Sequence, residues 1–106
     1  MDVINLDELT EVEPVPGFKV RFVHSKNMTI AHWDIRAGSV LPAHSHYHEQ
    51  VTQVIEGEFE LTVENETSRM GPNAVAIIDA HQHHTGRAIS ACRIIDVFYP
   101  VREDYR

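Results

Sequence analysis

Histidines are concentrated in one stretch of this sequence. From residue 38 to residue 57 the chain reads GSVLPAHSHYHEQVTQVIEG, and four ligand-type residues occupy even positions: His44, His46, His48 and Gln50. On an extended strand these side chains would project to the same face. Buried polar groups need partners, and one metal ion can satisfy several imidazoles and an amide at once. The stretch therefore predicts most of a mononuclear metal site; the alternative is a surface loop with incidental histidines.

The spacing within the stretch indicates which residues bind. His44 and His46 can bind one ion from a single extended segment, and Gln50, four residues later, can add a neutral carbonyl oxygen. A fourth ligand has to come from elsewhere, and the only rich source is a second histidine group: His81, His83 and His84. Nitrogen and amide ligands suit Ni, Zn, Mn, Fe or Cu, so they do not select one metal. Because Gln50 is neutral, the ion would keep its full dipositive charge, which favours Lewis-acid chemistry.

The last third of the chain carries another group of polar residues. Asp96 interrupts the apolar run RIIDVFY and shares a strand face with Phe98. A buried carboxylate needs a partner or a function, and beside a metal ion Asp96 could transfer protons. Arg102 follows Pro100 and could hold a substrate carboxylate through two hydrogen bonds. The alternative is an Asp96–Arg102 ion pair at the rim, with Phe98 as a core residue.

The remaining chemically interesting residues favour structural interpretations. His48 is expected to point outward or to support the ligands from behind. His24 and His32 are expected to be structural, and Trp33 to lie in the core or at an interface. Cys92 lies in the apolar run AISACRIIDVF and lacks an activating neighbour in sequence, which indicates a small buried core residue.

Short strands must position these residues. The segment 5–11 could form a helical turn, which the prolines at positions 14 and 16 would stop. Turn signals at 25–27, 57, 64–67 and 71–73 separate apolar or alternating runs at 18–23, 28–37, 58–64, 74–79 and 89–99. Many short strands without a long helix predict an all-β fold. A small antiparallel β-barrel is the economical form, because closure removes exposed strand edges.

The length and net charge of the chain argue against several classes of function. The chain of 106 residues fits one domain, expected to span 1–106. Its formal net charge is −7 and no Lys/Arg cluster is present, which argues against nucleic-acid binding. No apolar run is long enough to cross a membrane, and the N-terminus lacks signal-peptide features. A single cysteine agrees with a reducing compartment, so we expect a cytoplasmic protein.

The two histidine groups carry a family resemblance. The pattern Gly38-x5-His44-x-His46-x3-Gln50-x6-Gly57 resembles the first motif of the cupins, with glutamine where most members have glutamate. The segment from Gly71 to His84 resembles the second motif. This resemblance implies a jelly-roll-like double-stranded β-helix of the RmlC-like type. By spacing from Gly71 it also implies His84 as the fourth ligand, with His83 and His81 as alternatives.

A narrower resemblance involves the C-terminal part. HSHYHEQ together with DVFYPVREDY is similar to the small single-domain cupins of the pectin-degradation protein KdgF type, in which the glutamine ligand is usual. Such proteins linearise 4,5-unsaturated uronates, the products of pectin and alginate lyases, to 5-keto-4-deoxyuronate. The resemblance implies that Asp96, Phe98 and Arg102 complete the active site. It also implies a homodimer acting on a small sugar acid.

Two other functional classes fit the same ligands. A different cupin enzyme, such as a dioxygenase, would use the site with a redox metal. A non-catalytic ligand-binding cupin would use it for recognition alone, although 106 residues include no segment that reads as DNA-binding.

Overall fold

The computed structural model describes residues 1–106 and is built almost entirely from antiparallel strands. In chain order the elements are η1 (Leu6–Glu8), β1 (Val12–Val15), β2 (Phe18–His24), β3 (Thr29–Ile35), β4 (Val40–His44), β5 (Glu49–Glu56), β6 (Phe59–Val63), β7 (Glu66–Met70), β8 (Val75–Ile78), β9 (His84–Ala88), β10 (Cys92–Tyr99) and η2 (Glu103–Tyr105). The predicted all-β antiparallel fold is confirmed.

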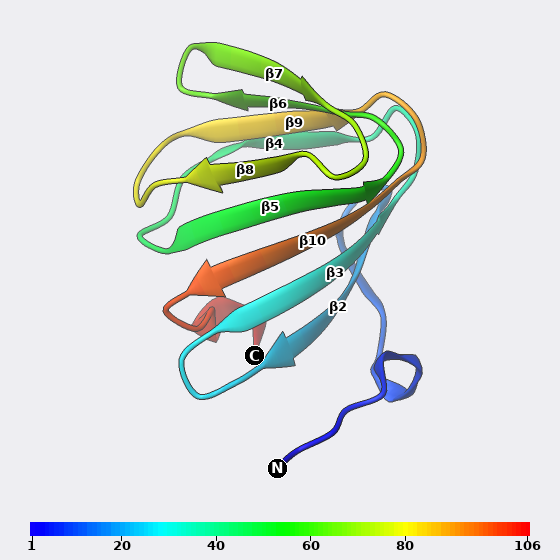
Figure 1. The fold of residues 1–106 in the computed structure, drawn as a ribbon, viewed down its shortest axis with the longest axis vertical. Coiled ribbons are helices and arrows are strands. Elements are labelled where there is room, and N and C mark those ends of the chain that lie inside the picture. Colours follow the sequence, from blue (N-terminus) through cyan, green and yellow to red (C-terminus); the bar gives the residue numbers. More distant parts are fainter.

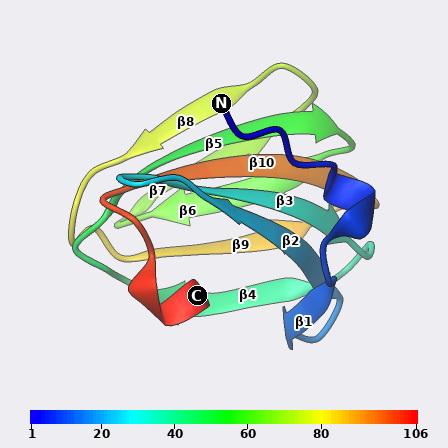
Figure 2. The ribbon, with the colours of Figure 1, turned by 90° about the horizontal axis from the view of Figure 1, so that it is seen from below.

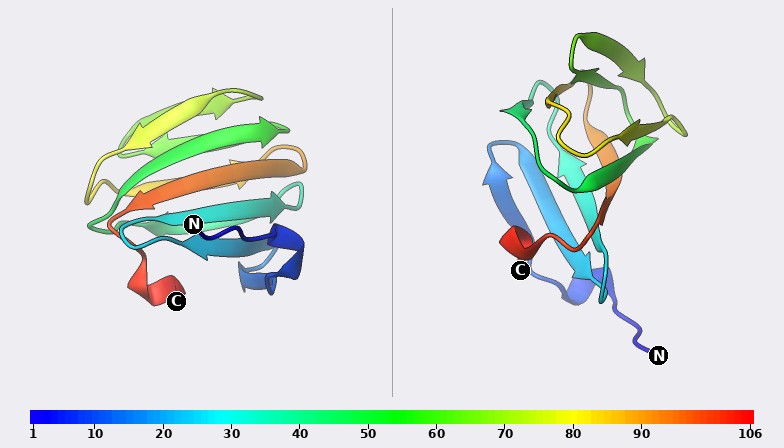
Figure 3. Two further views of the ribbon diagram at one scale, coloured as in Figure 1. Left: turned by 60° about the horizontal axis from the view of Figure 1, so that its bottom comes forward. Right: turned by 90° about the vertical axis from the view of Figure 1, so that its left-hand side faces the viewer.

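Two sheets form the molecule. A six-stranded sheet has the order β1-β2-β3-β10-β5-β8, and a four-stranded sheet has the order β4-β9-β6-β7. Figures 1 and 3 show the larger sheet curving around the smaller one. The barrel expected from the sequence is therefore a sandwich of two curved sheets rather than one continuous hydrogen-bonded cylinder.

Buried and more exposed residues alternate along the strands, and the buried ones form the core between the sheets. On β3 the alternate residues from Thr29 to Ile35 are buried, and on β10 those from Cys92 to Phe98 are buried. This period of two puts one face of each strand against the opposite sheet. Cys92 is 2% exposed, and burial raises the pKa of its thiol, as expected for a core residue.

One close approach between strands depends on glycine. Gly86 on β9 faces the Phe59 ring of the neighbouring β6, and a Cβ atom at position 86 would overlap that ring. The missing side chain lets Phe59 lie over β9, close to where this strand begins at His84. Gly57, with φ +87°, makes the turn into β6 in the left-handed region that favours glycine.

Most expected elements are present, with two differences. The runs at 18–23, 28–37, 58–64, 74–79 and 89–99 contain β2, β3, β6, β8 and β10, and the helical turn is η1. Strand β1 was not expected, because Pro14 lies within it; an edge strand tolerates a residue that donates no hydrogen bond. His44 to Gln50 do not form one extended strand. Strand β4 ends at His44, and the chain bends before β5 begins at Glu49.

Candidate metal centre

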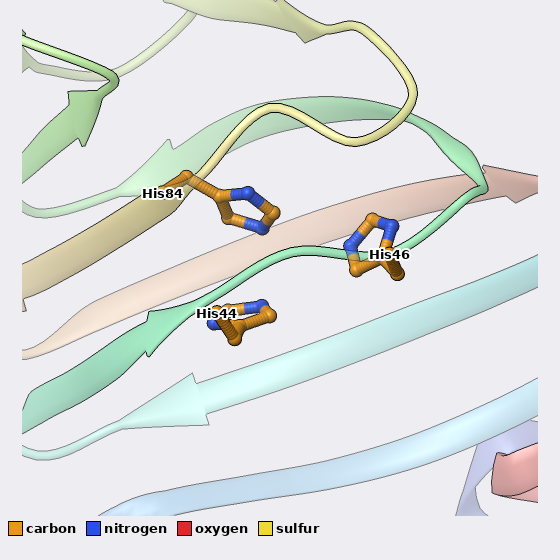
Figure 4. Close-up of side chains that lie close together, drawn as sticks. All are labelled: His44, His46 and His84. Atoms are coloured by element: carbon orange, nitrogen blue, oxygen red, sulfur yellow. The ribbon is translucent and has the colours of Figure 1, made fainter.

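Three imidazoles converge at one end of the sandwich. His44 is the last residue of β4, His84 is the first of β9, and the two are directly paired across these strands. His46 lies on the loop that follows β4. Figure 4 shows the three rings turned toward a common space. One ligand atom from each lies within 4.8 Å of the others.

Each of the three rings is oriented by a backbone carbonyl. The Nδ1 atoms of His44, His46 and His84 lie 2.9, 3.0 and 2.9 Å from the carbonyl oxygens of Pro42, His48 and Gln82. A carbonyl oxygen only accepts, so each Nδ1 must carry the proton and donate it. The Nε2 atom of each neutral ring then presents a lone pair, which is the tautomer that metal-ligating histidines adopt.

Gln50 adds an oxygen to the same space. Its Nε2 donates to Thr52 Oγ1 at 2.9 Å, which turns Oε1 toward His46 Nε2 at 3.1 Å. With the proton of His46 on Nδ1, two acceptor atoms face each other, and only a proton or a cation between them makes this contact favourable. The predicted ligand Gln50 thus lies against His46 although Gln50 belongs to the large sheet, whereas His44 and His84 belong to the small one.

Burial keeps the His46 and His84 rings neutral. Desolvation is the main cause that lowers the pKa of His46 to about 4, with the nearby positive Arg102 as the next cause. Desolvation also lowers the pKa of His84, whose Nε2 is buried without a hydrogen-bond partner. At neutral pH His46 and His84 therefore offer uncharged nitrogen donors, and the Nε2 atom of His84 is an unsatisfied buried atom.

These donors fit a divalent transition metal. Two nitrogens that are each about 2.1 Å from one ion lie at most about 4.2 Å apart, so binding needs only a small inward movement of the rings. His44, His46, His84 and Gln50 could supply three nitrogens and one oxygen, all neutral. Such a set leaves the charge of the ion uncompensated.

A buried carboxyl group is connected to this cluster. Asp96, 8% exposed, accepts hydrogen bonds from Thr52 Oγ1 at 2.6 Å and from Trp33 Nε1 at 2.9 Å. Together with the Gln50–Thr52 bond, these contacts form a chain from the candidate ligand to the carboxyl group. Desolvation raises the pKa of Asp96 to about 6, and the hydrogen bonds only partly oppose it.

A small cavity lies beside this chain. Its volume is about 40 Å³, and its walls combine polar side chains with the apolar core; the polar part consists of Gln50, Thr52, His84 and Asp96. A cavity of this size accommodates water but not a sugar ring. A monosaccharide would therefore have to bind outside it, at the end of the sandwich where the histidines converge.

The C-terminal segment lines this same end. The Arg102 guanidinium lies 4.7 Å from the centre of the Phe98 ring and 4.1 Å from that of Tyr105. It donates from Nε and from one terminal nitrogen to the two carboxylate oxygens of Asp104, at 3.0 and 2.7 Å. Phe98 in turn meets the edge of the His46 ring, with 5.7 Å between centroids. Arg102 is thus held at the site by aromatic faces and a two-pronged ion pair.

The structure decides between several alternatives that the sequence left open. No ion pair joins Asp96 to Arg102; the carboxyl group binds Thr52 and Trp33, and the guanidinium binds Asp104. His48 does not point outward: it is 4% exposed and supports the cluster through its backbone carbonyl, which accepts from His46. Trp33 lies in the core, one of the two places predicted for it.

The other histidines lie apart from the cluster. His81 and His83 are exposed, whereas His84 is buried at the start of β9. His24 Nδ1 contacts the Thr29 hydroxyl at 2.8 Å, and His32 lies on the outer face of the large sheet. None of these four belongs to the group of converging rings.

Sequence reasoning missed four residues around the site. Thr52 and Trp33 bind Asp96, and Asp104 and Tyr105 hold Arg102. The sequence did contain a signal for Thr52. It follows Gln50 by two positions, so on a strand its polar side chain must lie on the same inward face as Gln50. No local pattern identifies the other three, since their partners come together only through strand pairing or the C-terminal turn.

No helix in the structure has the length and apolar character needed to span a membrane. A comparison with curated proteins gave no match. Among solved structures, KdgF from Halomonas sp. is 25% identical with a TM-score of 0.93, covering 100% of this chain and 99% of that one. An RmlC-like cupin from Shewanella frigidimarina is 23% identical with a TM-score of 0.89, covering 94% and 91%. Ectoine synthase from P. lautus is 25% identical with a TM-score of 0.85, covering 96% and 80%.

The family model described as the cupin domain matches residues 31–98. The match includes both histidine groups and extends from β3 to the Phe98 position on β10. With this match and the two-sheet fold of the solved cupins, the chain belongs to the cupin family.

Proposed function

We propose that this protein binds one divalent transition-metal ion and opens the ring of 4,5-unsaturated uronate monosaccharides to give 5-keto-4-deoxyuronate. The observation that carries the proposal is the Asp96 carboxyl group, which hydrogen bonds through Thr52 connect to Gln50 and so to the cluster of three histidines. Similarity to Halomonas KdgF over the whole chain supports the same reaction class. The enzymatic nature of this neighbour and of ectoine synthase supports catalysis rather than binding alone.

The reaction moves protons without any external reactant. Ring opening breaks the bond between C1 and the ring oxygen, while the anomeric hydroxyl loses its proton and C1 becomes an aldehyde. The ring oxygen, attached to the C4–C5 double bond, becomes an enol oxygen. A proton then adds to C4 as the enol oxygen loses one, and C5 becomes a ketone. The product is an isomer of the substrate.

Asp96 is suited to these proton transfers. A carboxyl group whose pKa is about 6 can accept a proton near neutral pH and return it to the substrate. The bound ion would act as a Lewis acid toward substrate oxygens. Thr52 and Trp33 hold the two carboxylate oxygens in fixed positions, so the carboxyl group needs no reorganisation during the transfer.

Arg102 is suited to orient the substrate. Its guanidinium has five N–H groups, and the contacts to Asp104 use only some of them. The remaining N–H groups could bind the substrate carboxylate, while Phe98 supplies an apolar face beside His46.

Arg102→Lys keeps the positive charge but loses the pair of parallel N–H groups that can bind both oxygens of a carboxylate. We therefore expect a higher KM with a smaller change in kcat.

The test follows the enol absorbance of unsaturated galacturonate. Purified protein loaded in turn with Ni, Zn, Mn, Fe or Cu should accelerate the loss of absorbance over the spontaneous rate, and chelation should abolish the acceleration. The proposal fails if no metal gives a rate above background.

Oxygen uptake in the presence of diol or flavonol substrates would instead indicate a dioxygenase. Substrate binding without turnover would indicate a binding protein.

A further inference from the structure

Thr29, the first residue of β3, carries a hydroxyl group that is completely buried. Strand pairing places it in one row across the inner face of the large sheet; from β2 through β3 and β10 to β5 the members are His24, Thr29, Phe98 and Gln50. Residues directly opposite each other on neighbouring antiparallel strands have Cβ atoms roughly 5 Å apart. The row that contains the candidate ligand Gln50 and the aromatic residue Phe98 therefore continues to Thr29.

The Thr29 hydroxyl binds the backbone of Arg102. The Arg102 N–H donates to Thr29 Oγ1 at 2.9 Å, and both residues are buried. No other backbone N–H group of residues 100–106 donates to the body of the chain, since the two remaining backbone hydrogen bonds of this segment lie within it. Figures 1 and 2 show the segment leaving β10 beside the turn between β2 and β3, which precedes Thr29. One side chain thus anchors the backbone at the residue that carries the guanidinium.

His24 completes the hydrogen bonds of this hydroxyl. Its Nδ1 lies 2.8 Å from Thr29 Oγ1. Because the oxygen accepts from the Arg102 N–H, the hydroxyl has its single proton left to donate, and His24 Nδ1 is the acceptor within reach. Nδ1 is then the ring nitrogen without a proton. A proton on Nδ1 would instead leave the buried hydroxyl proton without an acceptor, which is unfavourable. The three groups therefore form one ordered chain from His24 to the Arg102 backbone.

Anchoring the Arg102 backbone also places its side chain. The guanidinium lies 4.7 Å from the centre of the Phe98 ring, and Phe98 is the neighbour of Thr29 on β10. The other groups that contact the guanidinium, Asp104 and Tyr105, belong to the C-terminal segment itself. They orient the fork relative to the segment, whereas the hydrogen bond to Thr29 orients the segment relative to the sheet.

We propose that Thr29 is a positioning residue for substrate binding: its hydroxyl fixes the Arg102 backbone so that the guanidinium meets the carboxylate of the uronate. The inference rests on the proposed function, in which Arg102 binds that carboxylate. A two-pronged contact depends on alignment, and a displacement of about 1 Å weakens it strongly. The carboxylate does not react, so it is bound alike in the ground state and the transition state. Loss of the anchor therefore acts on KM more than on kcat.

Removal of the hydroxyl tests this role. Thr29→Val keeps the branched shape of the side chain but leaves the Arg102 N–H without its partner. The stacking of Tyr105 on Phe22 remains, so circular dichroism should show an intact fold. With metal-loaded protein and unsaturated galacturonate we expect KM to rise about tenfold, while kcat changes by less than about threefold. Thr29→Ser keeps the hydroxyl and should stay near the wild type. Thr67→Val, which removes an exposed hydroxyl from β7, is the matched control.

Hydrogen exchange of the Arg102 amide gives a readout that needs no turnover. Followed by NMR of isotope-labelled protein, this amide should exchange slowly in the wild type and in Thr29→Ser, and about tenfold faster or more in Thr29→Val. The proposal is overturned if the amide stays protected in Thr29→Val, if the KM of this variant equals that of Thr67→Val, or if Thr29→Ser is equally impaired. A wild type without turnover would refute the proposed function instead, and the exchange rates would still decide whether Thr29 anchors the segment.

Discussion

Thr52 connects two groups of different function. Its hydroxyl accepts from Gln50 Nε2 and donates to Asp96 Oδ1, so one side chain fixes both the candidate ligand and the carboxyl group. Gln50 keeps its oxygen toward His46 only while its nitrogen is engaged at Thr52. The hydroxyl is therefore a positioning group for the cluster and for Asp96 together.

Replacement of this hydroxyl should weaken metal binding. Thr52→Val keeps the side-chain volume but leaves Gln50 Nε2 and Asp96 Oδ1 without their partner, so Gln50 becomes free to rotate. We expect metal affinity to fall by about 10- to 100-fold, as for other groups that orient ligands. Competition with a chromophoric chelator measures this change. Thr52→Ser, which keeps the hydroxyl, should stay near the wild type, and equal affinities for all three proteins would contradict the positioning role.

Asp96 should make stability depend on pH in the metal-free protein. Its pKa is about 6 in the folded chain against an ordinary value of 3.8, so the folded state keeps a proton that the unfolded state releases between these values. The contribution of Asp96 to stability is therefore greatest below pH 4 and declines as the pH rises through 6. The amide introduced by Asp96→Asn cannot titrate, so this variant does not lose stability in the same way. The difference between its free energy of unfolding and that of the wild type should therefore rise by about 3 kcal/mol from about pH 4 to about pH 7.

Urea titration of both proteins at several pH values, with chelator present, provides the measurement. The two proteins share every other titrating group, so the lowered pKa values of His46 and His84 cancel in the difference. A difference that stays constant across the window would show that the Asp96 carboxyl group titrates normally.

At the scale of the elements, the candidate ligands come from both sheets. His44 and His84 belong to β4 and β9 of the small sheet, Gln50 belongs to β5 of the large sheet, and His46 lies on the loop that joins them. One ion bound to all four would therefore cross-link the two sheets at this end of the sandwich.

Metal binding should accordingly raise the melting temperature. Free metal at about 100 times its Kd adds about 2.7 kcal/mol, which for a chain of this size corresponds to roughly 10 to 20 °C. Differential scanning calorimetry of chelated and metal-loaded protein measures the shift. His84→Ala should lose most of it, whereas His83→Ala, at the exposed neighbouring position, should keep it. A shift that persists in His84→Ala but vanishes in His83→Ala would assign the fourth ligand to His83.

The strands could be predicted from the sequence because their determinants are local. Alternation and turn residues identify β2, β3, β6, β8 and β10, and the ligand spacing identifies His44, His46 and Gln50 as a group. The end of β4 at His44 could not be predicted in this way. Histidines at even positions are compatible with one straight strand and also with a bend between two strands. The partners of Asp96 come from β3 and β5, and only the pairing of β10 between these strands brings them together.

At the scale of the whole molecule, one end of the sandwich and the outer face of the large sheet carry different kinds of side chains. The three histidines and the C-terminal segment gather at one end, and Figure 3 shows this segment following the end of β10. The outer face of the large sheet carries the exposed apolar side chains of Ile55, Val75 and Ile77 instead.

The position of Arg102 has a practical consequence for work on this protein. Its guanidinium is held between the Phe98 and Tyr105 rings, and Tyr105 also stacks on Phe22 with 4.4 Å between centroids. A change to the chain beside Tyr105, such as an inserted residue, would therefore alter the surroundings of the Arg102 guanidinium. Kinetic comparison between variants accordingly needs the sequence around Tyr105 to be kept unchanged.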